Sequence, residues 1–264
     1  MINTNLMIKL SVVVITFNEE RNIARCLASV QQVADEILVV DSLSTDNTVE
    51  ICKKYGARVI SHPFEGFIEQ KNFAMRQATF PHQLSLDADE ALTPELTNRI
   101  IEIKNNWTFD GYSMNRLSNY CGQWIRHSGW YPDTKLRLYD SRRGQWGGMN
   151  PHDRFELVPG ATTAHLQGDL LHYTYYTIEE HVAQSNKFST IAASELLERG
   201  RHATMLKIMV KPMAKFIRNY IIHGGFRDGF YGFVICRMAA HETFLKYAKA
   251  RHIRRAAGES GSKS

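Results

Sequence analysis

Residues 10–41 read LSVVVITFNEERNIARCLASVQQVADEILVVD, and this stretch decides the fold. Leu10 to Ile15 is an uninterrupted apolar run, which predicts a strand that is buried on both faces. Residues 19–30 place apolar side chains at helical spacing, and residues 36–41 form a second apolar run. A strand, a helix and a strand in this order predict a βαβ unit with two parallel strands.

The same alternation continues further along the chain. Asp46 can cap the next helix and Gly56 can end it. The further elements that we expect are a strand at 58–61, a helix at 67–78, a strand at 83–86, a helix at 94–103 and a strand at 135–139. The sequence therefore predicts an α/β fold with a Rossmann-like, mostly parallel sheet flanked by helices.

Composition and cysteine spacing exclude several classes of protein. With 264 residues, 44% of them hydrophobic, the chain can form a full core without disulfides or structural metals. The four cysteines, Cys26, Cys52, Cys121 and Cys236, form no CxxC pair and no zinc-site spacing. The N-terminus lacks the pattern of a signal peptide, and no apolar run reaches the roughly 18 residues of a spanning helix. We therefore expect a cytoplasmic protein.

The basic residues gather near the C-terminus. The net charge is +5, and residues 199–255 hold thirteen lysines and arginines but only two acids, Asp228 and Glu242. Residues 205–222 place apolar residues and cations on separate helical stripes, and Pro212 should kink this helix. Such a basic amphipathic helical extension suits an anionic membrane surface on the inner face of the cytoplasmic membrane. The alternative is that the apolar stripe packs on the rest of the protein. We expect no nucleic acid partner, because no recognition motif accompanies the charge.

Polar residues follow the strands of the predicted sheet. Thr16, Phe17 and Asn18 end the first strand, Asp41 ends the second, and Asp87 and Asp89 follow the strand at 83–86. In a parallel sheet these ends share one edge, where ligands bind. An aspartate after a strand is also a common turn former. Since the chain has neither GxGxxG nor GxxxxGK[ST], the pair Asp87 and Asp89 suggests Mg²⁺ or Mn²⁺ bridging to a diphosphate.

Four segments make a joint pattern that is similar to a known family: SVVVITFNEE (11–20), VVDSLSTDNT (39–48), GFIEQKN (66–72) and LDADE (86–90). They resemble the nucleotide-sugar domain of glycosyltransferase family 2 over at least Leu10 to Leu92. Weaker similarity in RLYD, NPHD, GDLLHYTYYT and GGFRDGFYGF points to the bacterial branch that extends lipopolysaccharide core, whose known members add glucose.

This resemblance implies a GT-A fold and inverting transfer. It implies that Thr16, Phe17, Asn18 and Glu19 line the nucleotide pocket and that Asp41 accepts a hydrogen bond from the base. Asp87 should face the ribose, Asp89 the metal-bound diphosphate, and Lys71 the phosphates; Lys71 can also be read as an exposed helix lysine. Many relatives carry two acids where this chain has Asp41 and Ser42.

The reaction also requires a general base, because an acceptor hydroxyl is a weak nucleophile until it loses its proton. We favour Asp153 for this role, with Glu156 and Asp133 as substitutes, while Asp153 can instead make a salt bridge to Arg154. Two histidines, His152 and His172, can contact the metal or a phosphate, or can serve as structural hydrogen-bonders.

Together these features predict a metal-dependent glycosyltransferase that uses a nucleoside-diphosphate sugar, UDP-glucose or a similar UDP-sugar. The expected acceptor is a hydroxyl of a cell-envelope glycan or glycolipid such as lipopolysaccharide core. The alternatives are a non-catalytic sugar-nucleotide or glycan-binding protein and a nucleotidyltransferase. The expected domains are a catalytic domain at 1–195 (donor half 1–92, acceptor half 93–195), a helical membrane-associating extension at 196–255 and a disordered tail at 256–264.

Overall fold

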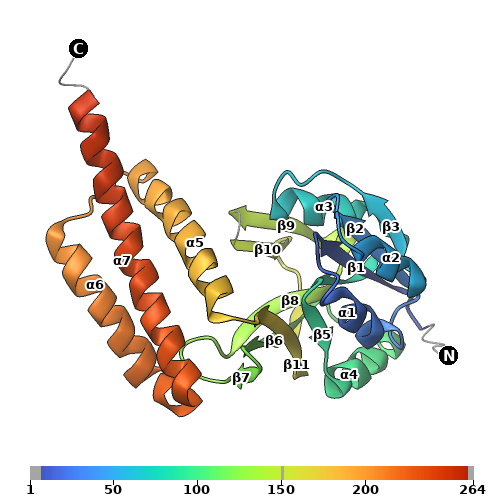
Figure 1. The fold of residues 1–264 in the computed structure, drawn as a ribbon. Helices are drawn as coiled ribbons and strands as arrows, with labels where there is room; N and C mark the ends of the chain where they lie inside the picture. The colour runs from blue at the N-terminus through green and yellow to red at the C-terminus, as the bar shows by residue number, and fades with distance from the viewer. Residues whose placement is uncertain (1–6, 150–151, 261–264) are drawn as a thin grey trace. The chain divides into compact units, whose positions relative to one another are not determined.

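The computed structural model describes residues 7–149 and 152–260, except for the side chains of residues 152 and 257–260. The chain forms two compact units, which we describe separately (Figure 1). The first unit comprises Met1–Leu117 and Pro132–Tyr173, and the second comprises Ser118–Tyr131 and Thr174–Ser264. These bounds differ from the domains expected from the sequence, because the segment at 118–131 and the helix that begins at Ile178 belong with the C-terminal helices.

The first unit contains most of one sheet and four helices. Its strands are β1 (Leu10–Thr16), β2 (Glu36–Asp41), β3 (Arg58–Ser61), β4 (His82–Asp87), β5 (Glu90–Leu92), β8 (Asp133–Asp140), β9 (Gly144–Met149), β10 (His152–Leu157) and most of β6 (Gly111–Tyr120) and β11 (Thr163–Tyr175). Its helices are α1 (Ile23–Val30), α2 (Thr48–Lys54), α3 (Phe67–Gln77) and α4 (Pro94–Asn105), with a 3₁₀ turn, η1, at Ser141–Arg143.

The sheet has the strand order β3-β2-β1-β4-β8-β6-β11-β5. The first four strands in this order are parallel to one another. The pairs β4–β8, β8–β6 and β11–β5 are antiparallel. The register places Thr16 beside Asp41 and Ile15 beside Asp87. The carboxyl ends of β1, β2 and β4 therefore meet at one edge, as the sequence predicts.

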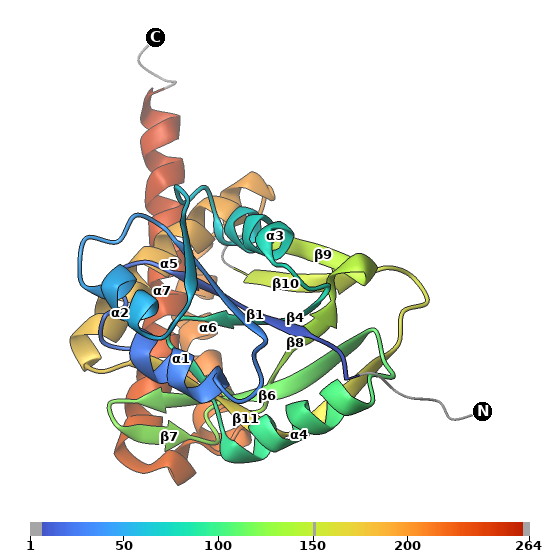
Figure 2. The same cartoon turned by 90° about the vertical axis from the view of Figure 1, so that its right-hand side faces the viewer.

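Helices cover both faces of this sheet (Figure 2). Val12 and Val14 of β1 pack in a cluster with buried residues of α1, α2 and α4, whereas Val13 packs on the other face with Ala74 of α3. Alternate side chains of one strand thus enter two cores, which explains the uninterrupted apolar run at 10–15. The predicted α/β fold is confirmed.

The helix expected from Glu19 begins only at Ile23. The backbone N–H groups of Glu19 and Glu20 donate to the side chains of Thr48 and Asp46. Since these bonds fix the backbone before Ile23 in a turn, the loop at 44–48 determines where the helix starts.

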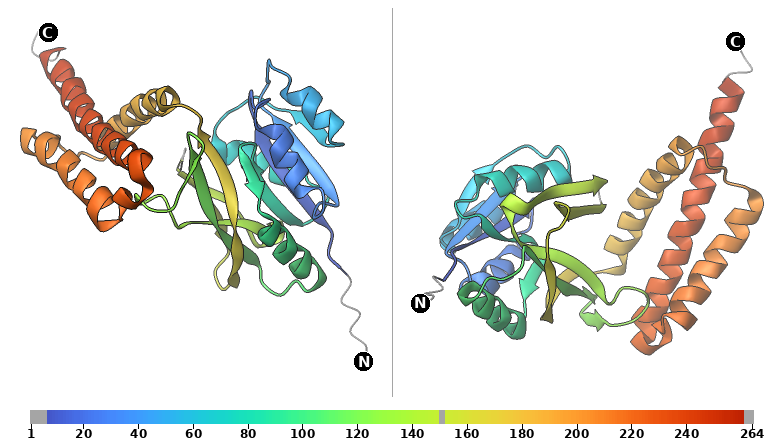
Figure 3. Two further views of the ribbon diagram at one scale, coloured as in Figure 1. Left: turned by 60° about the horizontal axis from the view of Figure 1, so that its bottom comes forward. Right: turned by 180° about the vertical axis from the view of Figure 1, so that it is seen from behind.

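The second unit is mainly helical and contains β7 (Gln123–Ile125), which pairs with the end of β6. Its helices are α5 (Ile178–Glu198), α6 (Met205–Ile217), a π-helical turn η2 (Arg218–Ile222), a 3₁₀ turn η3 (Gly225–Asp228) and α7 (Gly229–Ser260). Both α5 and α6 pack along α7 (Figure 3). In the described part of the chain, no helix combines the length and hydropathy that a membrane crossing requires.

Two details of the C-terminal region differ from or refine the sequence expectations. Residues 256–260, expected to be disordered, continue the helix α7 to Ser260, while residues 261–264 lie outside the described part. Pro212 lies inside α6, and the regular helix gives way to the π-helical turn only at Arg218.

Candidate active site

Thr16 and Asp41 lie side by side at the carboxyl ends of β1 and β2. Their exposed fractions are 5% and 2%. Oδ2 of Asp41 accepts a hydrogen bond from the Ser44 N–H at 3.0 Å, but Oδ1 of Asp41 and Oγ1 of Thr16 have no hydrogen-bond partner among the described residues. A buried polar atom without a partner costs about 1–3 kcal/mol. A ligand with complementary donors and acceptors at this edge would recover that energy.

Asn18 connects the loop after β1 to the loop after β2. Its backbone is left-handed, with φ 52°, and its Oδ1 accepts a hydrogen bond from the Thr45 N–H at 2.8 Å. Its own N–H donates to Oγ of Ser44 at 2.8 Å. Phe17, next to it, is 56% exposed. Asn18 therefore holds the two loops together and leaves the Phe17 ring at the surface.

Glu19 has an unusual protonation equilibrium. Burial and, to a smaller extent, the negative charges of Asp89, Asp46 and Asp87 together raise its pKa to about 7, although a hydrogen bond from Asn22 lowers it. A neutral carboxyl group and an ionised one are therefore both populated near pH 7.

Asp87 lies between two cations. Its Oδ1 is 3.0 Å from Nζ of Lys71, and its Oδ2 accepts a hydrogen bond from Nη2 of Arg137 at 2.8 Å. Burial alone would raise the pKa of Asp87, but the charges of Lys71 and Arg137 outweigh burial and hold the pKa well below its usual range. Asp87 is therefore ionised throughout the neutral range.

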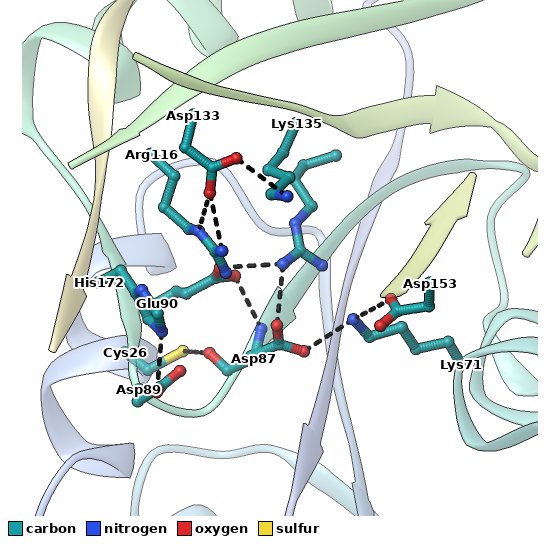
Figure 4. A network of polar contacts seen from close by, with 11 residues as sticks. Cys26, Lys71, Asp87, Asp89, Glu90, Arg116, Asp133, Lys135, Asp153 and His172 are labelled. Atoms are coloured by element: carbon teal, nitrogen blue, oxygen red, sulfur yellow. Dashed lines mark hydrogen bonds and ion pairs between the residues drawn. The ribbon is translucent and has the colours of Figure 1, made fainter. Parts of the chain in front are cut away.

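Lys71 joins Asp87 to Asp153. The lysine side chain is buried, and its Nζ donates to Oδ2 of Asp153 at 2.7 Å (Figure 4). The same Nζ lies 4.7 Å from the ring centroid of Trp146. The reading of Lys71 as an exposed helix lysine is wrong, because α3 turns this side chain toward the end of β4 and toward β10.

Arg137 is held by Glu90, which sequence reasoning did not assign to the site. Nη2 of Arg137 lies 2.9 Å from Oε1 of Glu90, while Oε2 of Glu90 accepts from the Asp87 N–H at 3.0 Å. Arg116 binds Glu90 at 3.2 Å and Asp133 at 2.8 Å. These contacts make a continuous chain of alternating charge, which we call the charge network: Asp133, Arg116, Glu90, Arg137, Asp87, Lys71 and Asp153.

Asp89 faces a histidine instead of a cation of the charge network. Its Oδ2 lies 3.2 Å from Nε2 of His172, on β11 (Figure 4). Two ligand atoms at about 2.1 Å from an ion and at right angles to each other are about 3.0 Å apart, so this pair fits neighbouring positions around Mg²⁺ or Mn²⁺. Asp87 fits such an ion less well, because both of its oxygens already face cations.

Two protein ligands are enough for such a site. Across the residues that the structure describes, no three histidine, cysteine, aspartate or glutamate side chains form a metal-binding group by themselves. Magnesium is commonly held by one or two carboxylates together with substrate phosphates. The residues present thus suit an ion that is bound together with a diphosphate.

The three candidate bases have different surroundings. Asp153 shares Lys71 with Asp87, whereas Glu156 pairs with Arg154 at 2.8 Å in an exposed position. Asp133 pairs with Arg116 and with Lys135. The expected alternative pairing of Asp153 with Arg154 is therefore not what the structure shows. The side chain of His152, which with His172 was expected to contact the metal or a phosphate, lies outside the described part.

Three residues of the charge network, Glu90, Arg116 and Arg137, were not predicted from the sequence, although the sequence does indicate that Arg137 needs a partner. Arg137 lies between Leu136 and Leu138 in an apolar strand, and a charged side chain in a buried strand needs a partner of opposite charge. Glu90 and Arg116 gave no such signal, because a charged residue beside a turn or in an irregular region is usually solvated.

Comparisons with known proteins identify the family of the chain. The model of the family described as "Glycosyl transferase family 2" matches residues 11–156. An uncharacterized glycosyltransferase of Rickettsia typhi is 32% identical over 256 residues, which is 93% of this chain and 87% of that protein. The lipopolysaccharide core biosynthesis glycosyltransferase LpsC of Rhizobium meliloti is 29% identical over 247 residues, 91% of each chain.

Among solved structures, the mannosyltransferase PcManGT of Pyrobaculum calidifontis, in complex with GDP-Man and Mn²⁺, aligns with a TM-score of 0.48 at 14% identity, covering 98% of this chain and 81% of that chain. The family match and the relatives carry the assignment. The chain belongs to glycosyltransferase family 2, and its α/β fold with a mostly parallel sheet flanked by helices agrees with the fold expected from the resemblance to that family.

Proposed function

We propose that the protein is a metal-dependent, inverting glycosyltransferase that moves one sugar from a nucleoside-diphosphate sugar to a hydroxyl of a cell-envelope glycan or glycolipid. The observation that carries this proposal is that Lys71 bridges Asp87 at the donor edge and Asp153. The cation Lys71, which can face a departing diphosphate, is thus in direct contact with Asp153, a carboxylate that can accept the proton of the acceptor. The similarity to LpsC supports lipopolysaccharide core as the acceptor.

The donor binds at the carboxyl ends of β1, β2 and β4. Thr16 and Asp41 bring a buried hydroxyl and a buried carboxylate oxygen, which suit hydrogen bonds to the base and ribose of a UDP-sugar. Lys71 and Arg137 bring positive charge toward the diphosphate. Two further nitrogens of Arg137, Nε and Nη1, are buried. Neither has a hydrogen-bond partner in the part of the chain that the structure describes.

Asp89 and His172 would hold a divalent ion, with Asp87 beside them. A bound Mg²⁺ or Mn²⁺ stabilises the negative charge that grows on the leaving diphosphate. The protein's own cations act in the same direction, because Lys71 and Arg137 are fixed by Asp87 before the substrate arrives.

Asp153 is the proposed general base. It takes the proton of the acceptor hydroxyl while the acceptor oxygen attacks the anomeric carbon on the face opposite to the diphosphate. The bond between the anomeric carbon and the phosphate oxygen breaks, and its electron pair leaves with the diphosphate. One displacement of this kind inverts the anomeric configuration. Lys71 holds the carboxylate of Asp153 in place, because Nζ of Lys71 lies 2.7 Å from Oδ2 of Asp153.

The C-terminal helices are the proposed membrane-associating part. Residues 196–255 carry the excess of basic residues, and a glycolipid acceptor is presented at a membrane surface. Association with the inner face of the cytoplasmic membrane would bring the enzyme and its acceptor together.

Calorimetry with a panel of UDP- and GDP-sugars, with and without Mn²⁺, tests the donor and the metal. Transfer to a lipid-free core oligosaccharide, followed by proton NMR of the new linkage, tests the reaction. We expect Mn²⁺-dependent binding of one UDP-sugar, release of UDP and an inverted anomeric centre. Binding without turnover would support a non-catalytic binding protein, and release of pyrophosphate from a nucleoside triphosphate would support a nucleotidyltransferase.

A further inference from the structure

A groove runs between α6 and α7 in the second unit. Its volume is about 590 Å³, and most of its lining residues are apolar, among them Ile208, Pro212, Phe216, Ala240 and Phe244. Arg237 and His241 are the two lining residues that can carry charge. A volume of this size lies in the usual range for small-molecule sites, about 300–1,000 Å³.

The groove opens onto an exposed apolar face of α6. Leu206, Met209, Val210, Met213 and Ile217 recur at helical spacing, and their exposed fractions lie between 49% and 71%. Met209, Met213 and Ile217 belong both to this face and to the lining of the groove. The exposed face of a surface helix is normally polar. The exposed face of α6 is instead apolar, which is typical of a face that another molecule covers.

The charged residues of α6 are all basic. Lys207, Lys211 and Lys215 lie on α6, and no acid occurs between residues 199 and 227. Arg237 lines the groove, with its guanidinium carbon 5.8 Å from the ring centroid of Phe216. An apolar channel beside cations is complementary to a molecule with a hydrocarbon chain and an anionic head group.

Asp228 and Glu242, the two acids of residues 199–255, differ in how far they offset the positive charge near the groove. Asp228 is buried and accepts hydrogen bonds from the backbone of Arg126 and His127 and from the hydroxyl of Ser128, so its charge is used inside the second unit. Glu242 of α7 is half-buried and is the remaining acid near the groove.

We propose that the groove between α6 and α7 binds one acyl chain of an anionic membrane phospholipid, with Arg237 beside its phosphate. This inference rests on the proposed membrane association and gives it a site: one lipid chain enters the groove while the apolar face of α6 lies in the bilayer interface. The methionines at the groove mouth suit this occupant, because their flexible, polarisable side chains adapt to chains of differing conformation.

Binding of dodecyl phosphate to the full chain, measured by calorimetry below its micelle concentration, tests the groove without a bilayer. We expect one saturable site. Met213→Glu and Phe244→Glu, from the two walls of the groove, should each weaken binding at least tenfold. Leu206→Glu is the matched control, because Leu206 lies on the same face of α6 and is similarly exposed but does not line the groove. Its affinity should stay within about threefold of the wild type.

The head group is tested with Arg237→Gln. This variant should lose affinity for dodecyl phosphate and keep its affinity for dodecyl maltoside, which has the same chain and no charge. The absence of saturable binding, or equal losses for Leu206→Glu and Met213→Glu, would overturn the site. Helical circular dichroism of each variant checks that the exposed substitutions leave the fold intact.

Vesicles identify the source of the lipid. The protein should sediment with phosphatidylglycerol vesicles, and Met213→Glu should reduce this binding more than Leu206→Glu does. Binding only to vesicles that contain a lipid-linked acceptor would overturn the assignment to a membrane phospholipid. A dimer in light scattering that Met213→Glu dissociates, without lipid binding, would show that a second copy covers this face.

Transfer to a lipid-free acceptor separates this inference from the proposed function. Met213→Glu should transfer sugar at the wild-type rate. If the wild type bound dodecyl phosphate and transferred no sugar, the proposed function would fail and the lipid site would stand.

Discussion

Arg137 and Glu90 form an ion pair that is closed to solvent: Nη2 lies 2.9 Å from Oε1, and the exposed fractions of the two side chains are 4% and 0%. Glu90 also accepts from the Asp87 N–H, so the pair fixes both the carboxylate and the backbone at the end of β4. The pair therefore helps to position Asp87, together with Lys71.

Removing one member of the pair should be costly. Arg137→Met leaves Glu90 buried with less compensating charge, and such losses cost about 3–5 kcal/mol. Urea unfolding monitored by circular dichroism measures the change. Arg142→Met is the control, since Arg142 pairs with Asp140 at the surface and should lose less than about 1 kcal/mol. Equal stabilities for the two variants would contradict the central role of the pair.

Lys71→Met should lower kcat by about 10²-fold or more, because it removes a fixed cation from the leaving diphosphate. Affinity for the nucleotide should fall less than kcat, since the cation is most effective when charge has developed. Steady-state kinetics and calorimetry with UDP separate the two effects. Arg76→Met, an exposed cation of the same helix, should retain full activity.

Asp153→Asn should reduce turnover by about 10²–10⁴-fold while donor binding persists, because the amide cannot take the acceptor proton. The measurement is the transfer rate at saturating donor, with calorimetric donor binding alongside. Glu156→Gln, which alters an acid three residues further along β10, serves as the comparison and should remain active. An active Asp153→Asn enzyme would exclude Asp153 as the base.

Asp89→Asn and His172→Gln should each weaken Mn²⁺ binding in the presence of UDP by at least about tenfold. Electron paramagnetic resonance of free Mn²⁺ gives the affinity directly, whatever the activity. His165→Gln, which alters a histidine on the same strand that pairs with Ser113, should leave the affinity unchanged. The Mn²⁺ affinity of Asp87→Asn then shows whether Asp87 is also a ligand. If Asp89→Asn bound Mn²⁺ as tightly as the wild type, the proposed metal site would be wrong.

His181 should make the protein less stable in mild acid. Burial lowers its pKa to about 4 from the ordinary value of 6.5, so the unfolded chain binds a proton at a higher pH than the folded protein does. The free energy of unfolding should therefore fall as the pH decreases from 6.5 to 4, by up to about 3 kcal/mol. Thermal unfolding across this range should show a smaller decline for His181→Gln, and identical pH profiles would show that another group is responsible.

The fold and the place of the site could be predicted from local pattern. Apolar runs and helical spacing over residues 10–41 depend only on neighbours in the chain, and parallel strands bring their carboxyl ends to one edge by geometry. Thr16, Asp41 and Asp87 therefore lie together as expected. The turn before α1 was not predicted, because side chains of Asp46 and Thr48, far along the chain, fix it.

The pairing of charges was decided by the tertiary structure alone. Lys71 and Asp153 are 82 residues apart and Glu90 and Arg137 are 47 apart, and nothing in their local sequence names the partner. The apolar stripe of α6 was visible in the sequence, but which side of the helix would face α7 was not. Local sequence determines what a segment can form, whereas the energy of a buried charge or an exposed apolar face depends on what the rest of the chain places against it.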